Sequence, residues 1–286
     1  MEHMNDIPEG RILPANGEGG SANFTNGNSG IGNRNTGSDL SQYNSESDAT
    51  SLAASRAPVE LKLEKTPVEF GHLLAALERQ IGPMSLQASP AGGAVNATGP
   101  YVLGITSAVA GEGKTSTALH LALTIARDTF KRVCLIDFSL GAGDMSTRLG
   151  LPTGSAGMVQ ALEADDSVVP TLQLAECDNL VVIPAGKSPA NAARLARSPR
   201  IGQMILSARD AFDLVILDLP DVASDNVLPI SQFADGIIMV ARSGATPSHV
   251  VARALDNIGR DKVLGVTLNR VTTAIPVWMQ RWLARA

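Results

Sequence analysis

The sequence predicts an α/β protein built on a doubly wound, mostly parallel sheet, preceded by a disordered N-terminal tail. From residue 100 onward, apolar runs of strand length alternate with helical patterns. The runs are continuously apolar, as in parallel strands that helices cover on both faces. The predicted strands are 101–106, 133–137, 180–185, 213–218, 236–241 and 263–269. The predicted helices of this part are 114–128, 190–209, 226–233 and 247–259.

Composition excludes several classes of function. The formal net charge is −5, which argues against a nucleic-acid partner. Cys134 and Cys177 cannot form a disulfide framework, and the four histidines lack metal-ligand spacing. No apolar run is long enough to span a membrane, and the polar N-terminus does not resemble a signal peptide. We therefore expect a cytoplasmic protein.

Four segments follow from shifts in composition. Residues 1–57 are rich in Gly, Asn and Ser, so we expect a disordered tail. Residues 58–99 form a helical arm and a linker, with a helix over 66–81 that Thr66 would cap. Residues 100–271 form the α/β domain, and residues 272–286 form an amphipathic C-terminal segment.

The stretch TSAVAGEGKTSTALHLA, residues 106–122, matches the phosphate-binding pattern G-x-x-x-x-G-K-[ST] except that Ala108 replaces the first glycine. A predicted strand precedes it and an apolar helix follows it, which is the context that this P-loop requires. Glycines let backbone N–H groups approach phosphate oxygens, and the helix adds its positive dipole end. An ordinary glycine-rich turn between a strand and a helix is the alternative. The residues expected at the nucleotide are Ala110, Gly111, Glu112, Gly113, Lys114, Thr115 and Ser116.

Two carboxylates complete the expected site. Asp137 and Asp218 each close a predicted strand, at the sheet edge where doubly wound proteins bind ligands. We expect both, with the Thr115 hydroxyl, to hold the Mg²⁺ of bound ATP, and Lys114 to contact the β- and γ-phosphates. Lys114, Asp137 and Asp218 are thus the candidate catalytic residues. A helix cap or a turn is the alternative role for each aspartate.

Together these motifs resemble the cytoplasmic domains of bacterial tyrosine kinases that work with polysaccharide co-polymerases. That family belongs to the deviant P-loop ATPases, as do the partitioning and septum-positioning ATPases. The resemblance covers about 100–271 and includes LVVIPAGKSPANAARLARSPRIGQMI (180–205) and FDLVILDLPDVASDN (212–226). It implies ATP and Mg²⁺ as cofactors, an inner-membrane co-polymerase as partner, and a contact between Asn269 and adenine; a polar cap at the end of the strand is the alternative role for Asn269. It also likens Asp225 to the acid that follows the second metal-binding strand; a helix cap is the alternative there.

The chain departs from the family pattern in three places. Where the family has a second acid, DFSLGAGDMSTRLGL (137–151) has Ser139, and the first arginine of that motif is Gly141. The C-terminal tyrosine cluster is absent, because the chain contains only Tyr43 and Tyr101. The arginines of the family's assembly motif are absent from the predicted helix 66–81. These losses imply an ATP-binding member that does not phosphorylate itself.

The C-terminal residues AIPVWMQRWLARA, 274–286, place Ile275, Trp278, Met279 and Trp282 at helical spacing on one face. One interpretation is a helix that contacts a partner or a membrane surface. The other is a terminal helix packed on its own domain.

The leading hypothesis is a nucleotide-binding regulator of exopolysaccharide synthesis or export, peripheral at the inner membrane through its partner. An active tyrosine kinase that modifies a partner protein is the second hypothesis. A positioning ATPase that dimerises around ATP is the third, although the lysine such proteins carry early in the phosphate loop is missing from 107–110.

Overall fold

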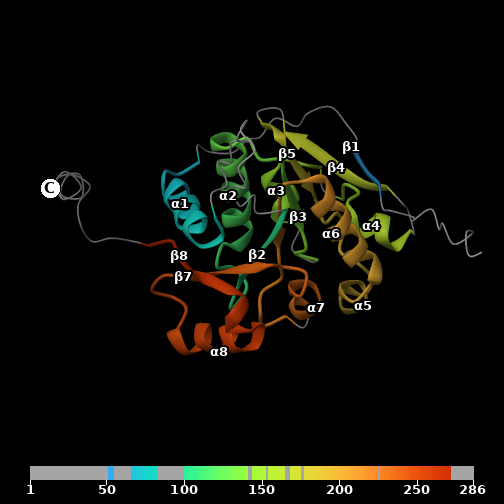
Figure 1. Cartoon of the computed structure of the whole chain (residues 1–286). Coiled ribbons are helices and arrows are strands. Elements are labelled where there is room, and N and C mark those ends of the chain that lie inside the picture. The colour runs from blue at the N-terminus through green and yellow to red at the C-terminus, as the bar shows by residue number, and fades with distance from the viewer. Residues whose placement is uncertain are drawn as a thin grey trace, which may run out of the picture. The chain divides into compact units, whose positions relative to one another are not determined.

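The computed structural model describes residues 51–54, 66–82, 100–140, 144–152, 154–164, 168–174, 177–224 and 226–271. Within these ranges the backbone forms a sheet with helices on both faces (Figure 1). The strands are β1 (Ser51–Ala54), β2 (Tyr101–Ser107), β3 (Val133–Asp137), β4 (Val168–Leu174), β5 (Cys177–Ile183), β6 (Leu214–Asp218), β7 (Gly236–Arg242) and β8 (Val263–Asn269). The helices are α1 (Glu69–Ile81), α2 (Lys114–Asp128), α3 (Asp144–Arg148), α4 (Met158–Glu163), α5 (Ala192–Ala196), α6 (Pro199–Ala211), α7 (Val227–Ser231), α8 (Ser248–Ile258) and the short 3₁₀ helix η1 (Arg260–Lys262).

The sheet has the order β1-β4-β5-β3-β6-β2-β7-β8, and its pairs are parallel except for β4 with β5. This confirms the predicted doubly wound, mostly parallel sheet. β3 and β6 pair in register so that Asp137 lies opposite Asp218. On the other side of β6, Ile105 of β2 also lies opposite Asp218. The carboxyl ends of three central strands therefore meet at one edge, where such sheets bind ligands.

Alternate residues of the central strands enter two hydrophobic cores. On β3, Cys134 and Ile136 belong to the core under α4 to α8, whereas Leu135 belongs to the core under α1 to α3. All three side chains are fully buried. Burying an aliphatic side chain of this size contributes roughly 1.5–3 kcal/mol to stability, so both cores favour the same backbone. Burial on both faces explains the continuous apolar runs in the sequence.

Two predicted helices have different bounds in the structure. The helix expected over 190–209 is divided into α5 and α6, because Ser198 has extended dihedral angles and Pro199 begins a new helix with no N–H to donate. α1 begins at Glu69, so the predicted Thr66 cap is wrong. The Thr66 hydroxyl instead accepts a hydrogen bond from Arg127 Nη1 at 3.3 Å.

Two strands were not predicted. β4 contains Pro170 and lies antiparallel to β5. β1 falls inside the segment 1–57 that was expected to be disordered, and it pairs in parallel with β4, so that expectation is wrong at Ser51–Ala54. The remainder of the tail, most of the linker 82–99, Asp225 and the C-terminal segment 272–286 lie outside the described residues.

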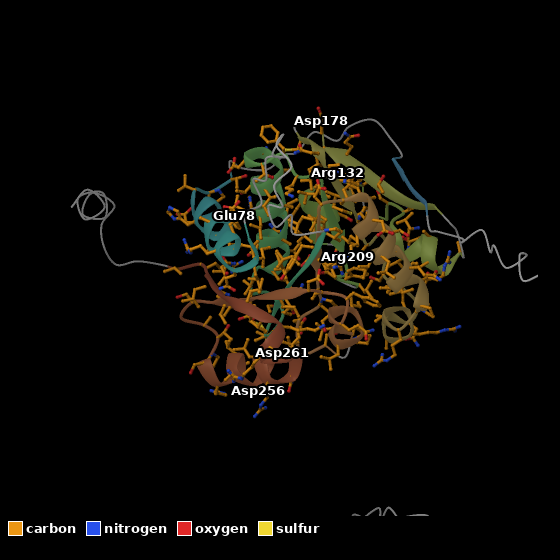
Figure 2. All side chains as sticks on the ribbon, in the orientation of Figure 1. Glu78, Arg132, Asp178, Arg209, Asp256 and Asp261 are labelled. Carbon is orange, nitrogen blue, oxygen red and sulfur yellow. The ribbon has the colours of Figure 1, made fainter. Side chains whose placement is uncertain are left out.

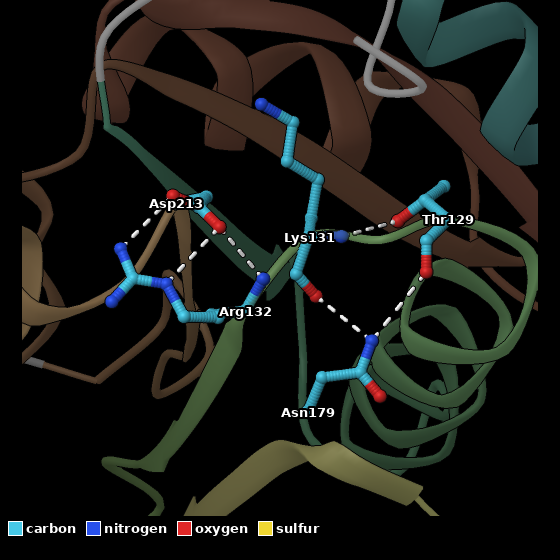
Figure 3. Close-up of polar contacts among 5 residues, drawn as sticks. All are labelled: Thr129, Lys131, Arg132, Asn179 and Asp213. Carbon is cyan, nitrogen blue, oxygen red and sulfur yellow. Dashed lines mark hydrogen bonds and ion pairs between the residues drawn. The ribbon is translucent and has the colours of Figure 1, made fainter. Parts of the chain in front are cut away.

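At the amino-terminal edge of the sheet, polar groups tie the starts of β3 and β6 together. Arg132 Nη2 lies 3.1 Å from Asp213 Oδ1, and the Arg132 N–H donates to Asp213 Oδ2 at 2.8 Å (Figure 3). The Asn179 amide donates to the carbonyl oxygens of Lys131 at 3.2 Å and Thr129 at 3.4 Å (Figure 3). These contacts hold the starts of β3 and β6 beside each other, at the sheet edge opposite the phosphate loop.

The charged side chains of this fold lie mainly on its outside. Figure 2 shows Asp178 and Asp256 on the outside of the ribbon, and Asp256 accepts a hydrogen bond from Arg260 Nε at 2.6 Å. Among the helices that the structure describes, none combines the length and the apolar character needed to cross a membrane. The buried charges described next are therefore exceptions that require an explanation.

Candidate functional site

The phosphate loop connects β2 to α2 and has the backbone that the motif predicts. Gly111 and Gly113 have φ of +80° and +97°, a region that residues with a side chain rarely adopt. Gly113 occupies the cap position of the 15-residue helix α2, and no side chain caps that end. The first N–H groups of α2 and its positive dipole end are therefore available to an anion.

Asn269, at the end of β8, contacts the phosphate loop directly. Its amide Nδ2 donates to the carbonyl oxygen of Glu112 at 2.8 Å. A Cβ atom at Gly113 would lie 2.0 Å from that nitrogen, so this close approach requires glycine. The structure thus brings Asn269 to the expected nucleotide site, although its amide here binds the loop itself.

Glu112 has a role that the motif does not reveal. The residue is 2% exposed, and its carboxylate accepts hydrogen bonds from the N–H of Val109 at 3.0 Å and of Arg242 at 3.1 Å. The Thr246 hydroxyl also donates to it. The carboxylate therefore braces the phosphate loop against the segment after β7, and only the backbone of Glu112 remains for a nucleotide.

Asp137 and Asp218 lie side by side at the ends of β3 and β6, and both are fully buried. Ser139 links them: its N–H donates to Asp137 Oδ1 at 2.9 Å, and its hydroxyl donates to Asp218 Oδ2 at 3.3 Å. Lys114 Nζ donates to the same hydroxyl at 3.2 Å. The structure therefore brings together Lys114 and both predicted aspartates, joined through Ser139.

The two carboxylates disfavour each other's charge. Burial, and next the negative charge of Asp218, raise the pKa of Asp137 to about 7, and the hydrogen bond from the Ser139 N–H opposes this only in part. Asp137 Oδ2 is buried and has no hydrogen-bond partner among the described residues. A buried, unsatisfied carboxylate oxygen beside a second carboxylate is the arrangement that a bound cation stabilises.

This donor set fits Mg²⁺ bound together with a phosphate. Mg²⁺ in nucleotide sites is held by one or two carboxylates plus phosphate oxygens and water. In the described part of the chain, no group of three or more His, Cys, Asp or Glu residues could hold a metal by itself. Thr115, the third predicted ligand, is 3% exposed in the first turn of α2. Two aspartates and one hydroxyl are too few ligands to complete the coordination of Mg²⁺, and the phosphate oxygens of a nucleotide would supply further ligands.

The loop after β5 is held by a residue that sequence reasoning missed. Gln160 Oε1 accepts hydrogen bonds from the N–H groups of Gly157 and Lys187, each at 3.0 Å. A Cβ atom at Gly186 would lie 2.1 Å from that oxygen, so this loop packs against the start of α4 without room for a side chain. The sequence assigned no role to Gln160, Arg242 or Thr246, because their contacts join segments far apart in the chain.

Known proteins resemble this chain in sequence and in fold, although no protein-family model matches it. The tyrosine-protein kinase YwqD of Bacillus subtilis is 32% identical over 168 residues, which cover 58% of this chain and 70% of YwqD. The succinoglycan biosynthesis transport protein ExoP of Rhizobium meliloti is 32% identical over 175 residues, which cover 59% of this chain and 22% of ExoP. The crystal structure of the VpsO kinase domain shares the fold with a TM-score of 0.56 at 24% identity, over 71% of this chain and 98% of that domain.

Proposed function

The chain belongs to the bacterial tyrosine kinase family, and from that premise we propose that it is an ATP-binding member that does not phosphorylate itself. We place its work in exopolysaccharide biosynthesis or export, as the name of the relative ExoP suggests. Its partner in this proposal is an inner-membrane co-polymerase, which holds the otherwise cytoplasmic protein at the membrane. Bound nucleotide sets whether the two proteins dock.

The phosphate loop carries the nucleotide part of this proposal. The backbone N–H groups of 110–116 bind the phosphates, and the Lys114 ammonium group neutralises their charge. Thr115, Asp137 and Asp218 hold Mg²⁺, which supplies positive charge against the phosphate oxygens. Asn269 limits the room above Gly113 and so orients the nucleotide at the loop, with a contact to adenine as the proposed further role.

The proposal that the chain does not phosphorylate itself depends mainly on Ser139. Its neutral hydroxyl stands between Lys114 and Asp218, where the family pattern has a carboxylate. Phosphoryl transfer depends on positioned charge, so a missing carboxylate lowers the rate while the phosphate cradle stays intact. Of the two tyrosines, Tyr43 lies outside the described residues, and Tyr101 begins β2 at the edge opposite the phosphate loop, with its N–H bonded to the Asp213 carbonyl at 3.2 Å.

A comparison of the wild type with Ser139→Asp tests this proposal. We expect both proteins to bind Mg-ATP within a few-fold of each other by calorimetry, and the variant to hydrolyse ATP at least tenfold faster. Ser139→Ala is the matched control, because it removes the hydroxyl without adding a charge, and its turnover should not rise. Fast turnover by the wild type, or phosphotyrosine on the wild-type chain itself, would contradict the proposal.

A second candidate function is phosphorylation of tyrosine in a partner protein. The observation that favours it is that Lys114, Asp137 and Asp218 remain together at the carboxyl edge. Incubation with labelled ATP and a purified co-polymerase tests it. Phosphotyrosine on the co-polymerase, absent when Lys114→Met replaces the wild type, would support this second function. A co-polymerase that stays unlabelled would exclude it for that partner.

A further inference from the structure

The face of β8 that is turned toward α8 carries an open apolar groove. It forms a cavity of about 340 Å³ between the end of β8, the loop after β7 and the side of α8 that runs from Ser248 to Leu255. Its apolar lining includes Val251, Leu255, Val266 and Leu268. Val266 is 43% exposed and Leu268 is 59% exposed, although both lie beside a hydrophobic core.

A shift in the pairing of β7 with β8 explains why these side chains face α8. The register changes between Ile237 and Ile238, after which Met239 lies opposite Val266, and Ala241 opposite Leu268. Met239 belongs to the core under α4 to α8. Side chains that lie opposite each other in a sheet point to the same face, so Val266 and Leu268 extend that core beyond the cover that α8 provides.

Exposed apolar side chains are concentrated here as nowhere else in the described residues. Leu206 on α6 and Leu228 on α7 are exposed singly, which is ordinary for a protein surface. By contrast, Val266, Leu268 and Val271 fall within six residues at the end of the described chain, and Val271 is 57% exposed. Val266 and Leu268 line the same groove, and an exposed apolar patch of this kind marks a contact surface.

We propose that the chain's own C-terminal segment, residues 275–282, docks in this groove as an amphipathic helix. Three residues, 272–274, separate this segment from Val271, and three extended residues reach about 10 Å, enough to place Ile275 at the groove. Pro276 suits the first turn of a helix. Ile275, Trp278, Met279 and Trp282 then form one apolar face, and the groove is large enough for an indole ring.

Connectivity selects this occupant over a separate molecule. A segment tethered by three residues has an effective concentration in the millimolar range at the groove, far above that of a free partner in the cell. Docking also covers the loop that contains Arg242 and Thr246, which holds the Glu112 carboxylate of the phosphate loop. The inference itself does not depend on nucleotide binding, because it rests only on the groove and the segment.

Tryptophan fluorescence of the full chain tests the proposal, because Trp278 and Trp282 are the only two tryptophans. We expect blue-shifted emission and at least threefold weaker acrylamide quenching than for a synthetic 272–286 peptide. Leu268→Glu and Val266→Glu should each move both values toward those of the peptide. Leu206→Glu and Leu228→Glu, which place the same charge on an exposed leucine elsewhere, are the matched controls and should leave emission unchanged. Far-ultraviolet circular dichroism verifies that every variant is folded.

Several outcomes would overturn the proposal. One is wild-type emission equal to that of the peptide, and another is emission insensitive to both groove variants. A blue shift that occurs only after anionic phosphatidylglycerol vesicles are added would identify a membrane surface as the occupant. A blue shift that disappears on dilution would identify a second copy of the chain. Failure of ATP binding would leave the proposal intact, so the two accounts are separately testable.

Discussion

The two edges of the central sheet contain similar residue types and place them in opposite electrostatic situations. At the amino-terminal edge, Asp213 is paired with Arg132 in a half-exposed setting. Burial raises the pKa of Asp213, but the hydrogen bonds and charge of Arg132 outweigh it, so this pKa lies below its ordinary value. At the carboxyl edge, Asp137 and Asp218 are buried beside each other, and the pKa of Asp137 is raised.

The difference separates a contact that holds the fold from one that destabilises it. The edge with Arg132 and Asp213 satisfies its own charges and needs no ligand. The edge with Asp137 and Asp218 leaves negative charge buried, and such an arrangement persists where function requires it. We infer that the carboxyl edge is built for a cation and its phosphate, at a cost to the stability of the empty protein.

The largest expected effect on Mg-ATP binding comes from replacing a lysine at the carboxyl edge, compared with replacing one at the amino-terminal edge. Lys114→Met removes the ammonium group that faces the proposed phosphates, and we expect it to weaken Mg-ATP binding by roughly 100- to 1000-fold, as for loss of one partner of a buried charge pair. Lys131→Met, at the amino-terminal edge, is the matched control and should bind normally. Calorimetric titration measures both. Equal affinity in the two variants would show that the ammonium group of Lys114 does not contact the phosphates.

The next effect concerns stability and its dependence on pH. The pKa of Asp137 is about 7 in the folded chain and near 4 in the unfolded chain. At any pH between these two values, Asp137 therefore keeps its proton in the folded state and has lost it in the unfolded state. The stability of the nucleotide-free protein should therefore fall as the pH rises from 4 to 7 and then level off. Asp137→Asn removes this loss, so the variant should be more stable than the wild type at pH 8, by at most about 4 kcal/mol at 1.4 kcal/mol per pKa unit.

Urea unfolding in EDTA at pH 4.5 and pH 8 measures this difference. The advantage of Asp137→Asn should shrink at the lower pH. Asp213→Asn is the control from the other edge: it removes a carboxylate whose pKa is lowered, so it should reduce stability to a similar extent at both pH values, because that contribution is lost only as the pH falls below about 4. A wild type that is more stable than Asp137→Asn at pH 8 would show that the buried pair is not under strain.

A smaller effect tests the brace on the phosphate loop. Glu112→Ala leaves the N–H groups of Val109 and Arg242 without their acceptor, and we expect a loss of about 1–3 kcal/mol in the free energy of unfolding, with weaker Mg-ATP binding. Glu163→Ala, at the end of α4, is the matched control. It removes a carboxylate that accepts a hydrogen bond from the N–H of Ala190, and it should leave ATP affinity unchanged. If both variants bind ATP alike, the brace has no part in the site.

The smallest effect belongs to the amino-terminal edge. Arg132→Ala should lower stability by less than about 1 kcal/mol, because the Arg132 side chain is 60% exposed and solvent screens the pair. Its ATP affinity should match that of the wild type. A loss of several kcal/mol in denaturant unfolding would show that this edge, too, contributes more than a surface ion pair.

Local patterns in the sequence predicted much of this molecule. α2 has the predicted bounds 114–128, since an apolar helix after a glycine-rich turn is a local signal. Asp137 and Asp218 were placed at strand ends, and parallel pairing brought them together. Strand β4 was missed because Pro170 obscures its pattern. The brace by Glu112 and the link through Ser139 were missed because they join residues that only the tertiary fold makes neighbours.

Calorimetric titration of the full chain with ATP, once in Mg²⁺ and once in EDTA, tests whether the site at the carboxyl edge binds a cation together with phosphate. If the buried pair at the carboxyl edge is built for a cation bound with phosphate, ATP should bind with micromolar or tighter affinity in Mg²⁺ and at least tenfold more weakly in EDTA. Well-folded protein that takes up no ATP in Mg²⁺, or that binds ATP equally in both buffers, would contradict the account.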